Sequence, residues 1–270
     1  MKHGLSVGQI FTKMVTRPHR AGAFLSSVTA GWKDSRVNNM LARIDLEQAS
    51  RDRDDCLGRL FGGAERVEEF LAELRSDHEF QEIQAQRRLQ IRELIRNRRA
   101  LVGTSSPFDA ETLYVITRAL QPEIIVETGV QYGAHTAHIL LALKNNGRGQ
   151  LHSIDFPQDL SPLECGYLVP EDLRGRWHLL LGDARDLLPK LLGQLHSIDI
   201  FIHDSDHSYR HMAWEYQTAW PYIVSGGVLF SHDVHYNSAF RELCQRHRNE
   251  ISDSFELFAS GVAAKRRETA

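Results

Sequence analysis

The sequence is poor in cysteine, in long apolar runs and in net charge, and each shortage excludes a class of protein. Its three cysteines, Cys56, Cys165 and Cys244, lie too far apart for a disulfide framework or a CxxC metal site, and they fit a reducing cytoplasm. The longest apolar run, around Ile139–Leu143, is far shorter than the roughly 18 residues of a membrane span. The net charge of −3 excludes a globally basic nucleic-acid binder. We therefore expect a cytoplasmic protein with no nucleic-acid partner and no membrane span.

The first hundred residues have helical character. Apolar residues recur at helical spacing between Ala64 and Leu101, and the turn cluster Gly103–Pro107 follows. We therefore predict a helical N-terminal extension over residues 1–105 and a second domain over residues 106–270. The basic, acid-free first 30 residues fit a transit peptide or a membrane-surface helix. Because a cleavage motif is missing, we favour an arm that packs on its own protein or on a second subunit, giving a homo-oligomer.

After Pro107, short β-favouring runs alternate with helical segments. The five runs that finish on an acid are Ile124–Glu127, Leu151–Asp155, Leu179–Asp183, Ile198–Asp204 and Val228–Asp233. The helical segments are Ala134–Lys144, Ala184–Leu192, His207–Tyr222 and Ser238–His247. This alternation predicts an α/β fold with a doubly wound, mostly parallel sheet and helices on both faces. Two last β-like stretches, Phe255–Phe258 and Val262–Lys265, flank Ser260-Gly261 and predict an antiparallel edge hairpin.

Acids at the ends of successive parallel strands indicate a ligand site. In an open α/β sheet, ligands bind outside the carboxyl ends of the strands, and all five acids point to that rim. Helix N-capping explains one such acid, but it is a weaker explanation for five in a row. An acidic rim also disfavours a naked phosphate and favours a ligand with hydroxyls, amines or positive charge.

The turn after the first run is rich in glycine, with Gly129 and Gly133 behind Glu127. Glycines let the backbone approach a ligand closely, but the spacing is not the dinucleotide GxGxxG, and no GxxxxGK[ST] phosphate loop is present. Asp155 ends the second run, where a carboxylate can accept two hydrogen bonds from a ribose diol. Asp183 ends the third run, where an acid or its neighbouring backbone can receive an adenine amine.

Taken together, these motifs resemble the class I S-adenosylmethionine-dependent methyltransferases. The resemblance is strongest to the branch that contains small-molecule O-methyltransferases and cephalosporin-hydroxylase-like proteins. The motifs that carry it are Glu127-x-Gly-x-x-x-Gly133, Asp155, Gly182-Asp183-Ala184, Asp204-x-x-His207-x-Tyr209, Pro221, Gly226-Gly227 and Ser231-His232-Asp233. The resemblance covers about residues 107–266 and implies a Rossmann-like fold.

The resemblance also implies a cofactor, S-adenosylmethionine, and residues that bind it. The implied cofactor-binding residues are Glu127, Gly129, Tyr132, Gly133, Asp155, Asp183, Ala184 and Asp204. The turn would cradle the methionine part, Asp155 would bind the ribose, and Asp183 with Ala184 would face the adenine. Metal-using relatives place a divalent cation near Asp204 and complete its site with acids or amides after the fifth strand. This chain has His232-Asp233 there, so we predict a Mg²⁺ or Mn²⁺ site formed by Asp204, His232 and Asp233.

Methyl transfer needs an acceptor that is held in line and has lost its proton. A base or a bound cation can remove that proton, and we predict His207 with Asp204 as the catalytic pair. The alternative for His207 is a residue at a helix start that hydrogen-bonds to a neighbouring acid. His203, His207 and His211 recur every four residues, but His203 is in strand register, which argues against a zinc-binding face.

We therefore expect an O-methyltransferase that acts on a small hydroxylated metabolite, a sugar or a natural product. One alternative is a nicotinamide-dependent oxidoreductase on a Rossmann-like sheet, against which the missing GxGxxG counts. Another alternative is a non-catalytic cofactor-binding or assembly protein, which is indicated by histidine in place of a metal-binding acid at position 232.

Overall fold

The computed structural model describes residues 46–96, 107–156, 163–257 and 259–267. The chain divides after residue 44, and every described residue belongs to the second unit, residues 45–270. The expected N-terminal arm and the turn cluster before Pro107 lie outside the described residues. The domain division at residues 105–106 and a homo-oligomer formed through the extension stay predictions.

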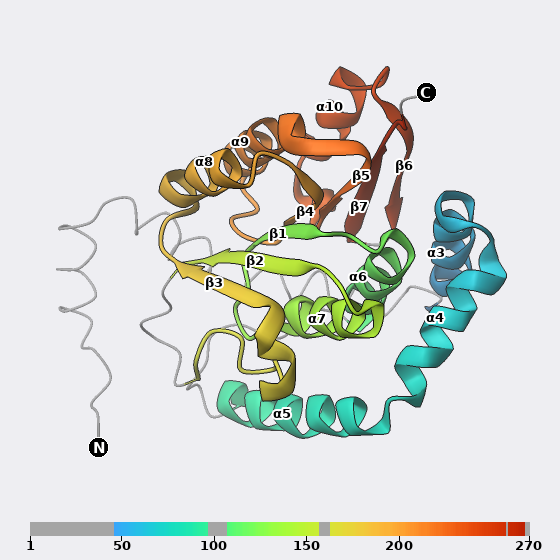
Figure 1. Cartoon of the computed structure of the whole chain (residues 1–270), viewed down its shortest axis with the longest axis vertical. Helices are drawn as coiled ribbons and strands as arrows, with labels where there is room; N and C mark the ends of the chain where they lie inside the picture. The colour runs from blue at the N-terminus through green and yellow to red at the C-terminus, as the bar shows by residue number, and fades with distance from the viewer. Residues whose placement is uncertain (1–45, 97–106, 157–162, 258, 268–270) are drawn as a thin grey trace, which may run out of the picture. The chain divides into compact units, whose positions relative to one another are not determined.

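The second unit contains a seven-stranded sheet with the order β3-β2-β1-β4-β5-β7-β6 (Figure 1). The strands are β1 (Ile124–Thr128), β2 (Gln150–Asp155), β3 (Trp177–Leu181), β4 (Ile198–His203), β5 (Ile223–Ser231), β6 (Ile251–Leu257) and β7 (Ser260–Lys265). Strands β1 to β5 are parallel, and β7 runs antiparallel to both of its neighbours, β5 and β6. The mostly parallel Rossmann-like sheet with its antiparallel C-terminal hairpin is therefore confirmed. The strand order reverses between β1 and β4, where sheets of this kind bind ligands.

Helices cover both faces of the sheet. The α-helices are α3 (Leu46–Phe61), α4 (Ala64–Ser76), α5 (His78–Arg96), α6 (Pro107–Leu120), α7 (Ala134–Asn146), α8 (Ala184–Leu195), α9 (Tyr209–Ala219) and α10 (Ala239–Arg246). Three short 3-10 turns are η1 (Glu171–Arg176), η2 (Trp220–Tyr222) and η3 (Val234–Tyr236). The expected helical N-terminal region is confirmed, and α3 and α4 pack on α6.

The two cores follow from the alternation of side chains along the buried strands. Ile125 and Ile200 pack with α6 and α7, whereas the adjacent Val126 and Phe201 pack with α8, α9 and α10. Successive side chains of a strand point to opposite faces, so a strand between two helical layers must be apolar throughout. This requirement explains why the central strands read as continuous apolar runs.

The structure differs from the predicted segments at two strand boundaries and in one additional helix. Strand β5 begins at Ile223, not at Val228. Ser260 and Gly261, expected in the turn, lie inside β7, where the Phe240 ring packs so closely that a Cβ on Gly261 would be 2.6 Å from it. Helix α6 has no counterpart among the predicted segments.

Helix α5 is connected to the glycine turn through the segment after β2. Arg87 donates hydrogen bonds to the carbonyls of Tyr167 and Val169 at 2.6 and 3.0 Å. The intervening Leu168 donates its N–H to the carbonyl of Tyr132 in the glycine turn at 2.7 Å. The N-terminal helical region therefore supports the turn from outside.

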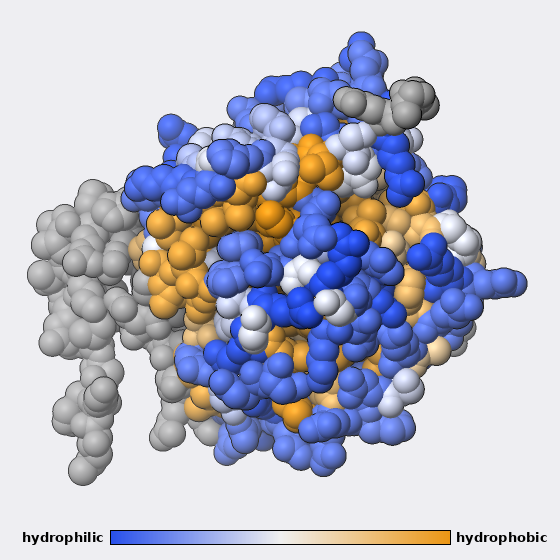
Figure 2. Space-filling model, in the orientation of Figure 1, coloured by the Kyte–Doolittle hydropathy of each residue, from blue (hydrophilic) through white to orange (hydrophobic). Residues whose placement is uncertain are grey.

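The surface in Figure 2 is largely hydrophilic but has an apolar area beside the β3 edge of the sheet. Exposed apolar residues at the neighbouring ends of β2 and β3 include Phe156, Leu180 and Leu181. None of the helices in the described part of the chain combines the length and apolarity needed to cross a membrane.

Candidate active site

The glycine turn lies directly against the end of β4. Gly129 has φ +86°, and a Cβ there would lie 2.0 Å from the carbonyl oxygen of Asp204. The N–H of Asp204 donates to the carbonyl of Thr128 at 2.8 Å, which locks the two strand ends together. Only glycine fits such a contact and such a φ value. Any group that sits on this turn is therefore adjacent to Asp204.

Glu127 lies beneath the turn and not on the rim. Its carboxylate is fully buried and accepts hydrogen bonds from Thr136 at 2.9 Å and Ser153 at 2.7 Å. Burial raises the pKa of Glu127 to about 8, because no cation compensates for the lost hydration. The glutamate therefore fastens β1 and β2 to the first turn of α7.

Asp155 ties the end of β2 to the glycine turn. Its carboxylate accepts the backbone N–H groups of Gln131 and Phe156, both at 2.8 Å, and the Cys165 thiol at 3.1 Å. Burial raises the pKa of Asp155 above its usual value. The acid lies where the sequence predicts it, at the carboxyl end of β2.

Two of the other predicted cofactor positions have structural roles. Strand β3 ends at Leu181, and Asp183 caps α8 by accepting the N–H of Arg185 at 2.9 Å. For Asp183, then, N-capping accounts for the acid; Ala184 follows it as the first residue of α8.

Two more of the predicted cofactor residues belong to the glycine turn. The ring of Tyr132 is buried in a cluster with Ile91. Gly133 starts α7 with a left-handed backbone, φ +80°.

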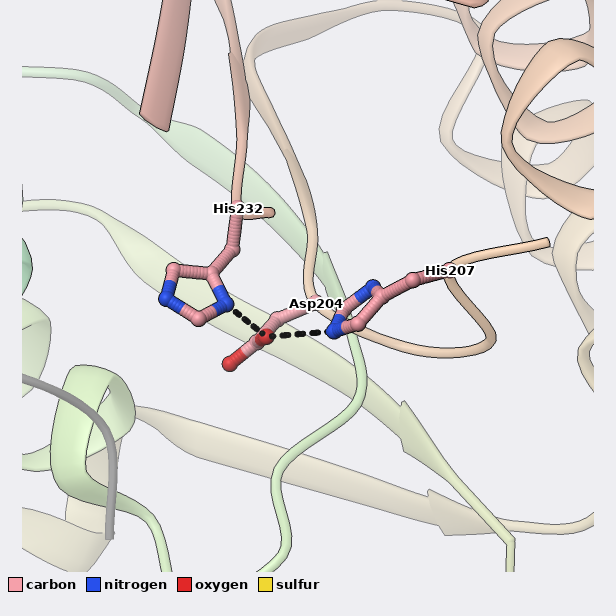
Figure 3. Close-up of side chains that lie close together, drawn as sticks. All are labelled: Asp204, His207 and His232. Atoms are coloured by element: carbon pink, nitrogen blue, oxygen red, sulfur yellow. Dashed lines mark ion pairs between the residues drawn. The ribbon is translucent and has the colours of Figure 1, made fainter. Parts of the chain in front are cut away.

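The rim between β4 and β5 gathers two histidines around one carboxylate (Figure 3). His232 Nδ1 lies 3.0 Å from Asp204 Oδ1, and His207 Nε2 lies 3.7 Å from the same oxygen. One ligand atom of each of these three residues lies within 4.8 Å of the others. His207, predicted as a catalytic residue, therefore lies beside Asp204 and His232, two of the three predicted metal ligands.

Two more side chains complete this rim cluster. Asp233 Oδ2 is 3.1 Å from His207 Nε2 and 3.6 Å from His232 Nδ1. His135 Nδ1 is 3.0 Å from Asp204 Oδ2. We call this set the rim cluster: Asp204, His207, His232, Asp233 and His135.

The rim cluster holds its charges by mutual attraction. Burial alone would raise the pKa of Asp204, but His232 and His135 outweigh it and hold the pKa well below its usual range. Burial likewise opposes a charge on His232, but Asp204 and Asp233 raise its pKa well above the usual value. The cluster thus already accommodates positive charge between two carboxylates.

A second cluster of histidines and a carboxylate lies fully inside the protein. Glu215 accepts hydrogen bonds from His203 at 2.5 Å, from Thr128 at 2.6 Å, and from Ser205 and His211 at 2.9 Å. Burial would raise the pKa of Glu215, but His203 and His211 hold it well below the usual value. We call this set the buried cluster: Glu215, His203, His211, Thr128 and Ser205.

The structure corrects the start of the helical segment predicted over His207–Tyr222, and with it the place of the histidines at four-residue spacing. His207 is not in the helix, because Ser208 caps α9 and the helix begins at Tyr209. His203 and His211 both bind Glu215, whereas His207 turns to the rim. The three histidines therefore share no metal-binding face.

Sequence reasoning missed two residues of the site, His135 and Asp109. His135 comes two residues after Gly133, in the first turn of the helix that follows the glycine turn. That position could have marked it as a site residue. Asp109 lies on α6, with Oδ2 3.5 Å from His232 Nε2. No local motif marks this acid.

Comparison with known proteins agrees with this geometry. Residues 126–234 match a family model described as a methyltransferase domain. This match agrees with the expected resemblance to the class I S-adenosylmethionine-dependent methyltransferases. The match favours a methyltransferase over the oxidoreductase and the non-catalytic alternatives. No curated protein matches the sequence significantly.

Several solved structures share the fold. The O-methyltransferase TomG from Streptomyces achromogenes, solved with S-adenosylmethionine, has 16% identity and a TM-score of 0.53 over 69% of this chain and 90% of its own. An O-methyltransferase from Bacillus cereus, solved with S-adenosylhomocysteine, has 12% identity and a TM-score of 0.52 over 67% and 91%. A methyltransferase from Geobacter sulfurreducens has 18% identity and a TM-score of 0.52 over 66% and 89%. At these identities the likeness shows the fold alone.

Proposed function

We propose that this methyltransferase methylates a hydroxyl group of a small metabolite, a sugar or a natural product, with the help of a divalent cation. The observation that carries the proposal is the group of Asp204, His207 and His232 at the rim. Through Gly129, this group lies against the turn on which the methyl donor would sit. An acceptor bound at the rim would therefore meet both the methyl group and the means of removing its proton.

The cofactor would lie across the ends of β1, β2 and β3. In this proposal the turn from Gly129 to Gly133 cradles the methionine part, and Glu127 acts from below by holding the turn. Asp155 binds the ribose hydroxyls with the acceptor capacity that its three present hydrogen bonds leave. The adenine would lie near Asp183 and Ala184, where the exposed ring of Phe156 offers apolar surface.

The rim cluster fits a divalent cation in distance and charge. Two atoms that bind one ion at about 2.1 Å lie roughly 3.0–3.4 Å apart, close to the 3.0 and 3.7 Å between Asp204 and the two imidazoles. Asp233 would add negative charge beside them. Of the two ions expected from the sequence, Mn²⁺ suits this set better than Mg²⁺, because imidazole nitrogen is a poor ligand for Mg²⁺.

Each rim residue would have a defined task. Asp204, His232 and His207 would hold the ion, and Asp233, whose Oδ2 lies 3.1 Å from the same nitrogen of His207, would face the ion beside them. A bound cation lowers the pKa of a hydroxyl and orients it for attack. His135 would keep the second oxygen of Asp204 in place. If no ion takes part, His207 with Asp204 is the base pair that accepts the proton.

The test is release of S-adenosylhomocysteine by the full chain from a panel of sugars and phenolic natural products. We expect a chelator to lower turnover about 100-fold and Mn²⁺ to restore it. Full activity in chelator would overturn the metal role and leave proton transfer to His207 with Asp204. No turnover with any hydroxyl acceptor, alongside turnover of amines, would overturn O-methylation.

Two variants separate the cofactor site from the cation site. S-adenosylhomocysteine at a hundredfold excess over its Kd should stabilise the wild type by about 2.7 kcal/mol. Asp155→Ala should lose most of this stabilisation and keep the response to Mn²⁺. In the same melting assay, Asp204→Asn should keep the stabilisation by S-adenosylhomocysteine and lose the response to Mn²⁺.

A further inference from the structure

Asp109 is a fully buried acid behind the rim cluster. It lies in the first turn of α6, and its Oδ1 accepts a hydrogen bond from Ser260 of β7. Its Oδ2 is buried, has no hydrogen-bond partner, and lies 3.5 Å from His232 Nε2. An acid in the first turn of a helix stabilises that helix equally well when its side chain is exposed. Helix stabilisation therefore does not explain why Asp109 is completely buried with one oxygen facing an imidazole.

His232 lies between carboxylates on its two sides. Nδ1 faces Asp204 at 3.0 Å, and Nε2 faces Asp109 at 3.5 Å. A histidine that binds a metal through one nitrogen almost always donates its other N–H to a carboxylate, a carbonyl or water. That second contact fixes both the tautomer and the direction of the ring. The pair Asp109–His232 has this arrangement.

We infer that Asp109 is a positioning residue that holds His232 with Nδ1 turned to the cation site. The inference rests on the proposed metal-assisted function and adds the element that makes the site rigid. Asp109 would accept the Nε2–H of His232, and Ser260 would keep the carboxylate from rotating away. The site would thereby depend on three elements distant in sequence, α6, β5 and β7.

The experiment measures cation binding directly, without turnover. The full chain is titrated with Co²⁺, whose visible absorption reports the ligand set, and with Mn²⁺ by calorimetry. Asp109→Asn keeps the size of the side chain and removes its charge. We expect 10- to 100-fold weaker binding and an altered Co²⁺ spectrum, as for other carboxylates behind a metal-bound histidine. Ser260→Ala should give a smaller loss in the same direction.

The matched control is Asp199→Asn. Asp199 is another acid that accepts hydrogen bonds from distant residues, the N–H groups of Glu123 and Ile124, but it lies at the start of β4, at the opposite end of the strand from the rim. We expect this variant to bind both ions as the wild type does. Melting in the presence of S-adenosylhomocysteine shows that each variant retains the cofactor site.

The outcomes separate the inference from the proposed function. If the wild type binds neither ion, the metal-assisted function fails and the inference fails with it. If the wild type binds and both Asp109→Asn and Ser260→Ala bind equally well, only the positioning role is overturned. Should Asp109→Asn not fold, an unchanged Co²⁺ affinity and spectrum in Ser260→Ala would overturn it.

Discussion

The rim cluster and the buried cluster are built from the same residue types at the end of the same strand, yet they differ in how their polar atoms are used. In the buried cluster one carboxylate, Glu215, accepts four hydrogen bonds and is fully enclosed. In the rim cluster four buried histidine nitrogens have no hydrogen-bond partner: both of His135, Nδ1 of His207 and Nδ1 of His232. Among the buried nitrogens of the buried cluster, only His203 Nε2 lacks one.

The difference teaches that spacing alone does not separate a ligand site from a structural network. His203 and His207 are four residues apart, but one completes the interior and the other faces the rim. A satisfied carboxylate at the centre of four donors gains nothing from a ligand. A set of close, unsatisfied nitrogens and acids is stabilised by an ion between them. The three predictions that follow test this division, from the largest effect to the smallest.

The largest effect is expected from Glu215→Ala in the buried cluster. The substitution leaves four donors unsatisfied in the interior and should lower the free energy of unfolding by about 3–5 kcal/mol. Urea unfolding of the wild type and variant measures the difference. Glu215→Gln, which keeps a carbonyl acceptor, should lose less. A loss below 1 kcal/mol for the alanine variant would show that the network is not structural.

The second test pairs His207→Ala with His211→Ala. We expect His207→Ala to lower turnover about 100-fold and to leave the melting temperature nearly unchanged. His211→Ala should do the opposite, because it removes a donor to Glu215 and no rim contact. Steady-state rates and melting curves of both variants give the answer. Equal losses of turnover would break the division between the clusters.

The smallest effect is a pH dependence of stability that originates in Glu215. Its pKa lies well below the ordinary 4.5 in the folded protein, so the unfolded chain takes up its proton first as the pH falls. The free energy of unfolding should therefore decrease below pH 4.5, by about 1.4 kcal/mol at pH 3.5 from this group. Subtracting the curve of Glu215→Gln isolates the contribution. A difference between the curves that does not change with pH would contradict this assignment.

Much of the fold and the centre of the site could be predicted because their signals are local. Apolar runs alternating with helical segments predicted β1 to β5, and the rule for strand ends placed Asp204 and Asp233 at one rim. The family resemblance added the cofactor. The elements can be predicted from short windows of sequence, and the rim can be predicted from the order of the strands along the chain.

The residues that could not be predicted depend on contacts distant in sequence. Asp109 and Ser260 are 151 positions apart, and no pattern near either residue indicates the other. Ser260-Gly261 has the composition of a turn, but the ring of Phe240 requires glycine within the strand. Helix α6 was missed although it starts with proline and carries an acid in its first turn. Its run of Tyr114, Val115 and Ile116 is as typical of a strand as of a buried helix.

The hydrogen bond between Asp109 and Ser260 has a consequence for the order of events during synthesis. Strand β7 inserts between β5 and β6, so Ser260 reaches Asp109 only after nearly the whole second unit has left the ribosome. Contacts of such sequence separation form late, because closing the long loop costs chain entropy. On the proposed role of Asp109, a nascent chain that already displays Asp204 and His232 would lack a fixed imidazole with which to bind a metal ion. Ion selection at the proposed site would then wait for the finished fold.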